Sequence, residues 1–147
     1  MPTHSEIRHL PYSAQQMYDL VADVERYPEF LPWTAAARIR DTREQGDHVV
    51  MLADLVISFK VFRERFGSRV TLWPEARRID TEYLDGPFNH MISHWTFSEA
   101  DGGSEVSFYV DFEFRNRLLQ ATATVFFNEA MQRVVRAFER RAADLYG

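Results

Sequence analysis

The fold is decided by the stretch EVSFYVDFEF, residues 105–114, and by the helical pattern that follows it from Leu118 to Leu145. Within residues 105–114 apolar side chains occupy every second position, which is typical of a strand with one buried face. From Leu118 onward apolar residues recur at spacings of three, four or seven, which is typical of an amphipathic helix. About 28 helical residues span roughly 40 Å, enough to cross a whole sheet. The two segments predict an α+β fold in which a long C-terminal helix lies against a sheet.

The residues upstream predict the remainder of this sheet. A strand over residues 3–10 is followed by a short helix, for which Ser13 and Gln16 form a capping box. Residues 25–33 contain two prolines among large apolar side chains and predict a further helical turn or two. From Thr34 to Phe114 the dominant period is two, which indicates an antiparallel meander. The predicted architecture is a helix-grip fold, an antiparallel sheet of about seven strands wrapped around the C-terminal helix.

Composition limits the functions that the chain can have. It has 147 residues, of which 46% are hydrophobic, a formal net charge of −5 and no cysteine. The length and apolar content predict one domain over residues 1–147. The negative charge argues against DNA as a partner, and the lack of cysteine excludes disulfides and thiolate metal sites. Because no signal peptide or membrane-spanning segment is recognisable, we expect a cytoplasmic protein, with peripheral contact at the inner membrane as an alternative.

A helix across the concave face of a curved sheet leaves a gap that suits an apolar small molecule. The sheet residues predicted to line it are Phe66, Tyr83, Met91, Trp95, Phe108 and Phe112, and the helix residues are Phe126, Phe127, Ala130 and Val134. Two apolar segments that contain prolines predict its entrance, and they contribute Tyr27, Phe30, Leu31, Pro32, Trp33, Pro87 and Phe88. The alternative interpretation is a filled core whose open ends these segments cap.

The sequence offers no catalytic constellation. His90 and His94 lie in a predicted strand, where four residues separate side chains by ~13 Å, too far for one metal ion. Phosphate-binding loops, nucleophile elbows and paired-carboxylate motifs are absent from the sequence. Asp54, within an apolar strand, is either a candidate acid or a charge at a sheet edge or cavity wall. We therefore expect a protein that is not an enzyme and that uses no metal or cofactor.

Arginines gather on the outer faces of the predicted strands, close to acidic residues of neighbouring strands. This arrangement predicts cross-strand ion pairs. The alternative is a basic docking patch for an anionic membrane or RNA. The arginines are Arg38, Arg40, Arg63, Arg65, Arg69, Arg77 and Arg78, and the acidic residues are Asp80, Glu82, Glu105, Asp111 and Glu113.

Several motifs resemble, in order along the chain, those of a known family. They are Tyr27-Pro28-x-Phe30-Leu31-Pro32-Trp33, Gly86-Pro87-Phe88, Trp95-x-Phe97, Phe112-Glu113-Phe114 and Phe138-Glu139-x-Arg141-Ala142. The combination resembles the coenzyme Q-binding branch of the START-like polyketide cyclase/dehydrase superfamily. This resemblance implies the helix-grip fold and a cavity for a polyprenyl quinone, and it does not imply cyclase activity. Thr34 stands where the family commonly has a cysteine, so no thiol acts at that position.

Two functions follow from the resemblance. The first is binding of a polyprenyl quinone between sheet and helix by a lipid carrier or chaperone that supports respiratory electron transport. Because some bacterial relatives are toxins that block the association of ribosomal subunits, the alternative is a ribosome-binding growth inhibitor that acts through Arg63, Arg65 and Arg69. An aromatase or cyclase ranks lowest, since no acid–base pair can be named.

Overall fold

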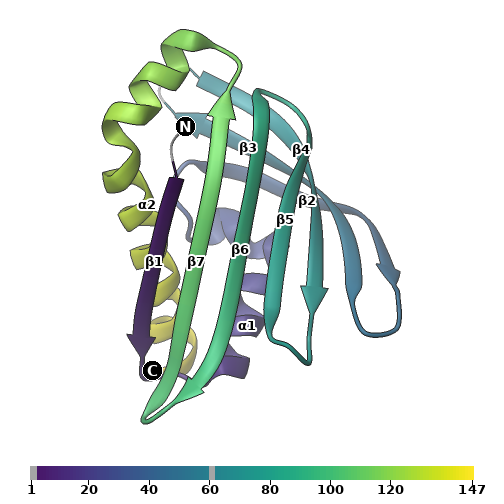
Figure 1. Ribbon diagram of the computed structural model, residues 1–147, viewed down its shortest axis with the longest axis vertical. Helices are drawn as coiled ribbons and strands as arrows, with labels where there is room; N and C mark the ends of the chain where they lie inside the picture. The colour runs from purple at the N-terminus through teal and green to yellow at the C-terminus, as the bar shows by residue number, and fades with distance from the viewer. Residues whose placement is uncertain (1–2, 60–61) are drawn as a thin grey trace.

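The computed structural model describes residues 3–59 and 62–147, leaving out the side chains of Phe59, Phe62, Ala123, Phe126 and Phe127. It contains a seven-stranded sheet, two α-helices and a 3-10 helix (Figure 1). In chain order the elements are β1 (Thr3–Leu10), α1 (Ala14–Ala22), η1 (Val24–Glu29), β2 (Thr34–Glu44), β3 (Val49–Phe59), β4 (Phe62–Trp73), β5 (Arg78–Asp85), β6 (Phe88–Ala100), β7 (Gly103–Phe114) and α2 (Arg117–Tyr146). The predicted helix-grip α+β architecture is confirmed.

The strands form one antiparallel sheet with the order β1-β7-β6-β5-β4-β3-β2. Strands β2 to β7 follow one another as the predicted meander, while β1 pairs with β7, with Thr3 opposite Asp111 and Leu10 opposite Ser104. The first and the last strand of the chain therefore lie side by side (Figure 1). Helix α2 follows β7 directly and returns along the same edge of the sheet.

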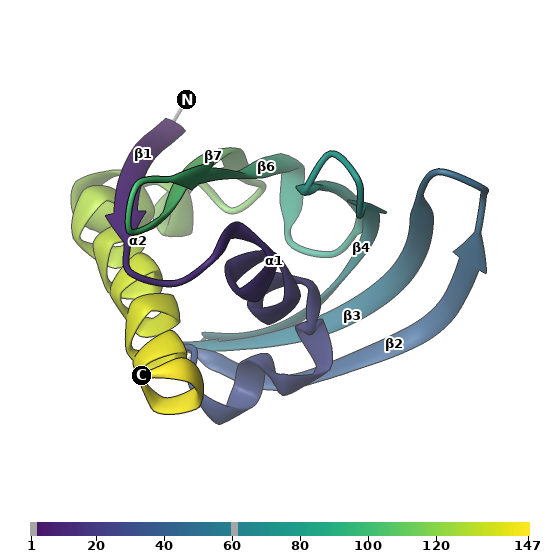
Figure 2. The same ribbon diagram turned by 90° about the horizontal axis from the view of Figure 1, so that it is seen from below.

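Helix α1 lies inside the curve of the sheet (Figure 2). Its start is fixed by the predicted capping box: the Gln16 N–H donates to Ser13 Oγ, and the Ser13 N–H donates to Gln16 Oε1, each at 3.0 Å. Met17 and Val21 are among its side chains that are fully buried against the sheet. Because α1 occupies only part of the concave surface, the remaining part must be covered by η1, the connection to β2, and α2.

Two hydrophobic clusters divide this concave space. The larger cluster surrounds α1 and includes Trp95 from β6 and Phe138 and Ala142 from the C-terminal half of α2. The smaller cluster contains Phe66, Phe88, Val110 and Phe112, with Met131 of α2 packed against it. The C-terminal half of α2 is therefore part of the main core, whereas its N-terminal half covers a different region of the sheet.

The outer face of the sheet carries the predicted cross-strand ion pairs. Arg65 of β4 binds Asp54 of β3 at 2.8 Å and Asp85 of β5 at 2.9 Å. Arg69 of β4 is paired with Glu82 of β5. Asp54 is thus part of an ion-pair network, and these arginines lie among carboxylates of opposite charge. Within the described part of the chain, no helix is long and apolar enough to cross a membrane.

Candidate apolar binding cavity

A cavity of about 320 Å³ lies between the sheet, the η1–β2 connection and the N-terminal half of α2. Its walls come from three parts of the chain that are distant in sequence. The lining residues are Leu31, Pro32, Trp33 and Thr34 from the connection, Ile57, Phe66, Pro87, Phe88, Met91, Val110, Phe112 and Phe114 from the sheet and its β5–β6 turn, and Leu119, Thr122, Ala130, Met131 and Val134 from α2.

The lining is almost entirely hydrocarbon. Among the described residues that line the cavity, none is ionisable, and the only hydroxyl groups belong to Thr34 and Thr122. Thr122 Oγ1 donates to the backbone oxygen of Leu118 at 3.0 Å, and Thr34 Oγ1 faces the backbone oxygen of Pro32 at 3.5 Å. Their hydrogen-bonding capacity is therefore directed to the backbone. The cavity can remove apolar groups from water, but it supplies no acid, base or nucleophile.

The backbone conformation of Trp33 fixes the wall formed by the η1–β2 connection. Trp33 has φ 63°, in the left-handed region that a bulky side chain rarely adopts. Its carbonyl oxygen accepts a hydrogen bond from the Ser58 N–H of β3 at 2.8 Å, immediately before β2 begins at Thr34. Unfavourable conformations of this kind persist where the surroundings hold them, often at ligand sites. Here the conformation accompanies an indole group on the cavity wall.

A glycine turn fixes the floor of the cavity. Gly86 has φ 138°, and a Cβ at this position would lie 2.6 Å from Phe66 Cβ, so the β5–β6 turn can approach β4 only as glycine. The turn leads into Phe88, whose ring centroid lies 5.4 Å from that of Phe66 and 4.7 Å from that of Phe114. We predicted Phe88 at the entrance, but it is 8% exposed and forms part of the floor.

The structure brings ten of the predicted site residues together around this cavity. They are Leu31, Pro32, Trp33, Phe66, Pro87, Phe88, Met91, Phe112, Ala130 and Val134. The side chains of the predicted Phe126 and Phe127 lie outside the described residues. Five further predicted residues, Tyr27, Phe30, Tyr83, Trp95 and Phe108, do not line the cavity.

Tyr27 and Phe30 do not form an entrance, because η1 turns their rings toward the helices. The Tyr27 hydroxyl donates to the backbone oxygen of Val21 in α1, and its ring centroid lies 5.5 Å from that of Phe138. Burial raises the pKa of Tyr27 above the ordinary range for tyrosine. The Phe30 ring lies 5.3 Å from Phe138 and 5.2 Å from the Arg141 guanidinium. Both residues join η1 to α2.

Trp95 and Tyr83 belong to the packed interior. Trp95 is 7% exposed, and its ring lies 4.3 Å from Phe108 and 5.1 Å from Phe138, so α2 fills the space that it faces. The Tyr83 ring lies 5.4 Å from Phe88, and its buried hydroxyl has no hydrogen-bond partner among the described residues. At these two positions the rings pack against other side chains of the protein and do not line the cavity.

Seven lining residues are absent from the predicted set. They are Thr34, Ile57, Val110, Phe114, Leu119, Thr122 and Met131. Val110 and Phe114 share the strand face of the predicted Phe112, so their alternation could have identified them. Met131 is three residues before Val134 on the same helix face and could have been found in the same way.

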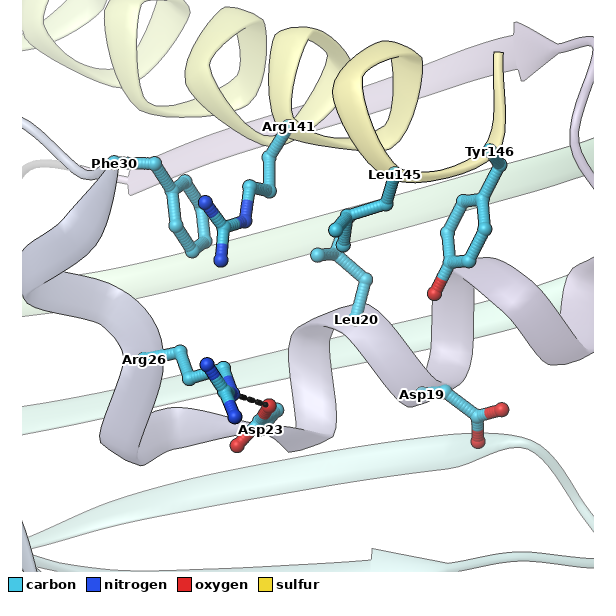
Figure 3. A pocket seen from close by; sticks show the side chains of 8 residues that line it. All are labelled: Asp19, Leu20, Asp23, Arg26, Phe30, Arg141, Leu145 and Tyr146. Carbon is cyan, nitrogen blue, oxygen red and sulfur yellow. Dashed lines mark ion pairs between the residues drawn. The ribbon is translucent and has the colours of Figure 1, made fainter.

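A second, charged pocket of about 170 Å³ lies where the C-terminal end of α2 meets α1 and η1 (Figure 3). Arg141 from α2 binds Glu29 at 2.7 Å, and Arg26 binds Asp23 at 3.1 Å. These side chains neutralise one another and attach α2 to η1. Their arrangement suits a structural junction, and its polar lining differs from that of the apolar cavity.

The two histidines of β6 lie beside separate carboxylates on the outer face of the sheet. His90 Nε2 lies 3.3 Å from Asp111, and His94 Nδ1 lies 2.7 Å from Asp80. The His94 ring also stacks on Tyr109 of the neighbouring strand. Each imidazole therefore lies beside a carboxylate of its own, on the face of the sheet opposite the apolar cavity.

A curved antiparallel sheet, a long C-terminal helix and an apolar cavity between them define a helix-grip protein. A model of the polyketide cyclase/dehydrase and lipid transport family matches residues 10–139. The chain belongs to this family.

The chain is similar to proteins with two different kinds of name. The chain is 35% identical over 145 residues to the ribosome association toxin RatA of Rickettsia prowazekii, covering 97% of this chain and 95% of the toxin. It is 34% identical over 149 residues to the mitochondrial coenzyme Q-binding protein COQ10 homolog B of Xenopus laevis, covering 98% of this chain but only 59% of that longer protein. The solution structure of an 18 kDa protein from Caulobacter crescentus superimposes with a TM-score of 0.84 at 33% identity, covering 100% of this chain and 99% of that one.

Proposed function

We propose that this protein binds a polyprenyl quinone in the apolar cavity and acts, without catalysing a reaction, as a lipid carrier or chaperone for respiratory electron transport. The observation that carries this proposal is a cavity lined by hydrocarbon with no ionisable side chain among its described lining residues. The name of a relative that is 34% identical, a coenzyme Q-binding protein, supports the same ligand class.

The size of the cavity limits how much of such a ligand it takes. Its 320 Å³ lies near the lower end of the roughly 300–1,000 Å³ found for ligand pockets. A cavity of about 150 Å³ accommodates a benzene ring. The space therefore suits one end of a quinone, about two ring-sized groups, and the rest of a long isoprenoid tail stays outside. Burying roughly 300 Å² of apolar surface contributes about 7 kcal/mol before ordering costs, which corresponds to a Kd on the order of 10 µM.

The test is a titration of the protein with a short-tailed ubiquinone, in which calorimetry measures Kd. Trp33→Ala removes the indole from the cavity wall and should raise Kd by about tenfold, equivalent to ~1.4 kcal/mol. Trp73→Ala is the matched control, because the Trp73 indole stacks on His48 and donates to Asp80 outside the cavity. Equal Kd values for both variants would show that the ligand binds elsewhere.

A second candidate is a ribosome-binding growth inhibitor, favoured by the 35% identity to a ribosome association toxin along 97% of the chain. Under this candidate, the purified protein lowers the fraction of joined subunits in a sedimentation profile. Reversing Arg63, Arg65 and Arg69 to glutamate tests the outer face of β4. Trp33→Ala should leave this activity intact. The Trp33 variant therefore tests quinone binding, and the β4 arginine variant tests ribosome binding.

A further inference from the structure

Charge is distributed unevenly between α2 and the rest of the protein. Helix α2, residues 117–146, contains five arginines and three acidic residues. Of the totals of 17 basic and 22 acidic residues, 12 basic and 19 acidic residues lie elsewhere. Between Arg115 and Asn128 there is no acidic residue. Helix α2 therefore has a formal charge of +2, whereas the rest of the protein has a formal charge of −7.

The outward face of α2 also exposes large aliphatic side chains. Leu118 is 78% exposed and Val125 is 75% exposed, and seven residues, close to two helical turns, separate them. Arg136 follows Leu118 by 18 residues, which is five turns at ~3.6 residues per turn, and Arg140 lies one turn further. One face of α2 therefore carries an aliphatic N-terminal half and a basic C-terminal half.

The arginines of this face remain available for an external anion. Arg136 and Arg140 are exposed and form no ion pair with a carboxylate of the described residues, while Arg136 bonds the neutral Gln132 at 3.3 Å. Arg117 is exposed beside Leu118. The outward Glu129 is paired with Arg133 at 3.1 Å, and the exposed Asp144 lies one turn after Arg140. With Arg133, Arg136 and Arg140 against Glu129 and Asp144, this side of α2 keeps an excess of positive charge.

The aliphatic half of the face is adjacent to the apolar cavity. Leu119, which directly follows Leu118, lines the cavity, and so does Thr122, which lies one turn after Leu118 at the border between the outward face and the cavity. Thr122 is exposed although it lines the cavity, so the cavity opens beside this half of α2. In Figure 1 this half lies at the end of the molecule where β7 passes into α2.

We propose that the outward face of α2 docks on an anionic lipid bilayer. Leu118 and Val125 enter the boundary between headgroups and acyl chains, and Arg136 and Arg140 bind lipid phosphates. An amphipathic helix with aliphatic and arginine side chains on one surface suits this interface. RNA would engage the arginines but would leave the aliphatic side chains exposed to water. Docking goes beyond quinone binding and requires no particular ligand in the cavity.

The test is flotation with phosphatidylcholine vesicles that contain or lack phosphatidylglycerol. The protein should float with the anionic vesicles only, and the bound fraction should fall as salt increases. Leu118→Asp with Val125→Asp, and separately Arg136→Glu with Arg140→Glu, should each weaken binding by at least about tenfold. Ile7→Asp is the matched control, since Ile7 is 62% exposed on β1, away from this face.

Two further measurements show whether a variant has lost its fold or its cavity and not only its membrane binding. Thermal unfolding of the variants should match that of the natural sequence, because all the changed side chains are exposed. Binding of short-tailed quinone in solution should also be unchanged, which separates docking from the cavity. The proposal is overturned if the natural protein does not float, if the Leu118/Val125 variant floats as well as the Ile7 variant, or if the protein binds ribosomal RNA and not vesicles.

Discussion

The Phe138 ring meets the Trp95 ring edge to face, with their centroids 5.1 Å apart. This contact joins the C-terminal half of α2 to β6 in the main core. The N-terminal half of the same helix has no equivalent: its side chains cover an unfilled cavity on one side and leave Val125 75% exposed on the other. One helix therefore combines a structural half with a half that is free to serve binding.

The stability of the fold should depend on the C-terminal half of α2 and not on its N-terminal half. Phe138→Ala removes a side chain that is 3% exposed and that contacts Tyr27, Phe30 and Trp95, and should lower the free energy of unfolding by about 3–5 kcal/mol. Val125→Ala should change it by less than about 0.5 kcal/mol. Denaturant unfolding measures both. Similar losses of unfolding free energy in the two variants would show that the two halves of α2 contribute equally to stability.

The β5–β6 turn should tolerate only glycine at residue 86. Gly86→Ala combines a positive φ with a Cβ placed 2.6 Å from Phe66 Cβ, whereas Gly46→Ala has a φ of 82° and no atom within 4 Å. At Gly46 the positive φ alone should make alanine lower the free energy of unfolding by about 1–2 kcal/mol. Gly86→Ala should lower it further, because the β5–β6 turn must also move away from β4. Chemical unfolding of both variants isolates the contact, and equal losses would show that the turn is not held against β4.

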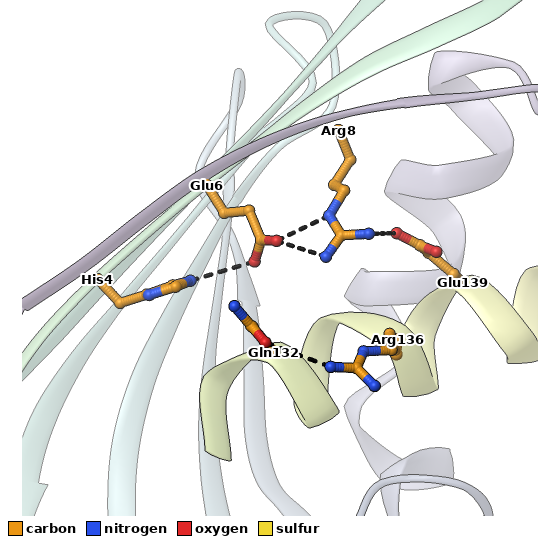
Figure 4. A network of polar contacts seen from close by, with 6 residues as sticks. All are labelled: His4, Glu6, Arg8, Gln132, Arg136 and Glu139. Atoms are coloured by element: carbon orange, nitrogen blue, oxygen red, sulfur yellow. Dashed lines mark hydrogen bonds and ion pairs between the residues drawn. The ribbon is translucent and has the colours of Figure 1, made fainter. Parts of the chain in front are cut away.

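A polar network links β1 to α2 (Figure 4). Glu6 accepts hydrogen bonds from Arg8 at 2.7 Å and from His4 at 3.1 Å, and Arg8 also binds Glu139 of α2 at 2.8 Å. Burial of Glu6 opposes its ionisation, but the hydrogen bonds from His4 and Arg8 outweigh burial and lower its pKa below the ordinary 4.5.

This shift predicts how stability depends on pH. A carboxyl group whose pKa is lower in the folded protein stabilises the fold above its unfolded pKa, and this contribution is lost as pH falls below about 4.5. Glu6→Gln should lower the free energy of unfolding by roughly 1–3 kcal/mol near neutral pH and by less in acid. Urea unfolding measured from neutral to acidic pH tests this prediction. Glu105→Gln, on the exposed side of β7, is the control. A difference between Glu6→Gln and the natural protein that does not change with pH would argue against the assignment.

The alternating strands, the capping box at Ser13 and the long helix could be predicted because each depends on local periodicity. Cavity and core could not be separated in the same way. Met91 and Trp95 share one face of β6 at a distance of ~13 Å, yet Met91 lines the cavity and Trp95 is packed against Phe138. Only the placement of α2 relative to the sheet distinguishes them. The inward turn of Tyr27 and Phe30 likewise depends on the path of η1, which two prolines in sequence do not specify.

Filling the cavity from the helix should abolish ligand binding without damaging the core. Ala130 lies on the cavity wall, so Ala130→Phe would occupy space that the quinone needs. Ala143→Phe, at an exposed position of the same helix, is the matched control. Both variants should unfold at temperatures close to that of the natural protein, because the added ring at Ala130 enters existing space and does not displace packed atoms.

If the cavity between the sheet and α2 holds a polyprenyl quinone, organic extraction of the purified protein followed by mass spectrometry should detect it. We predict a polyprenyl quinone in extracts of the natural protein and of the control variant Ala143→Phe. Extracts of Ala130→Phe should contain at least about tenfold less quinone. Equal quinone in all three extracts, or a quinone-free extract from protein produced in quinone-rich cells, would contradict quinone binding in this cavity.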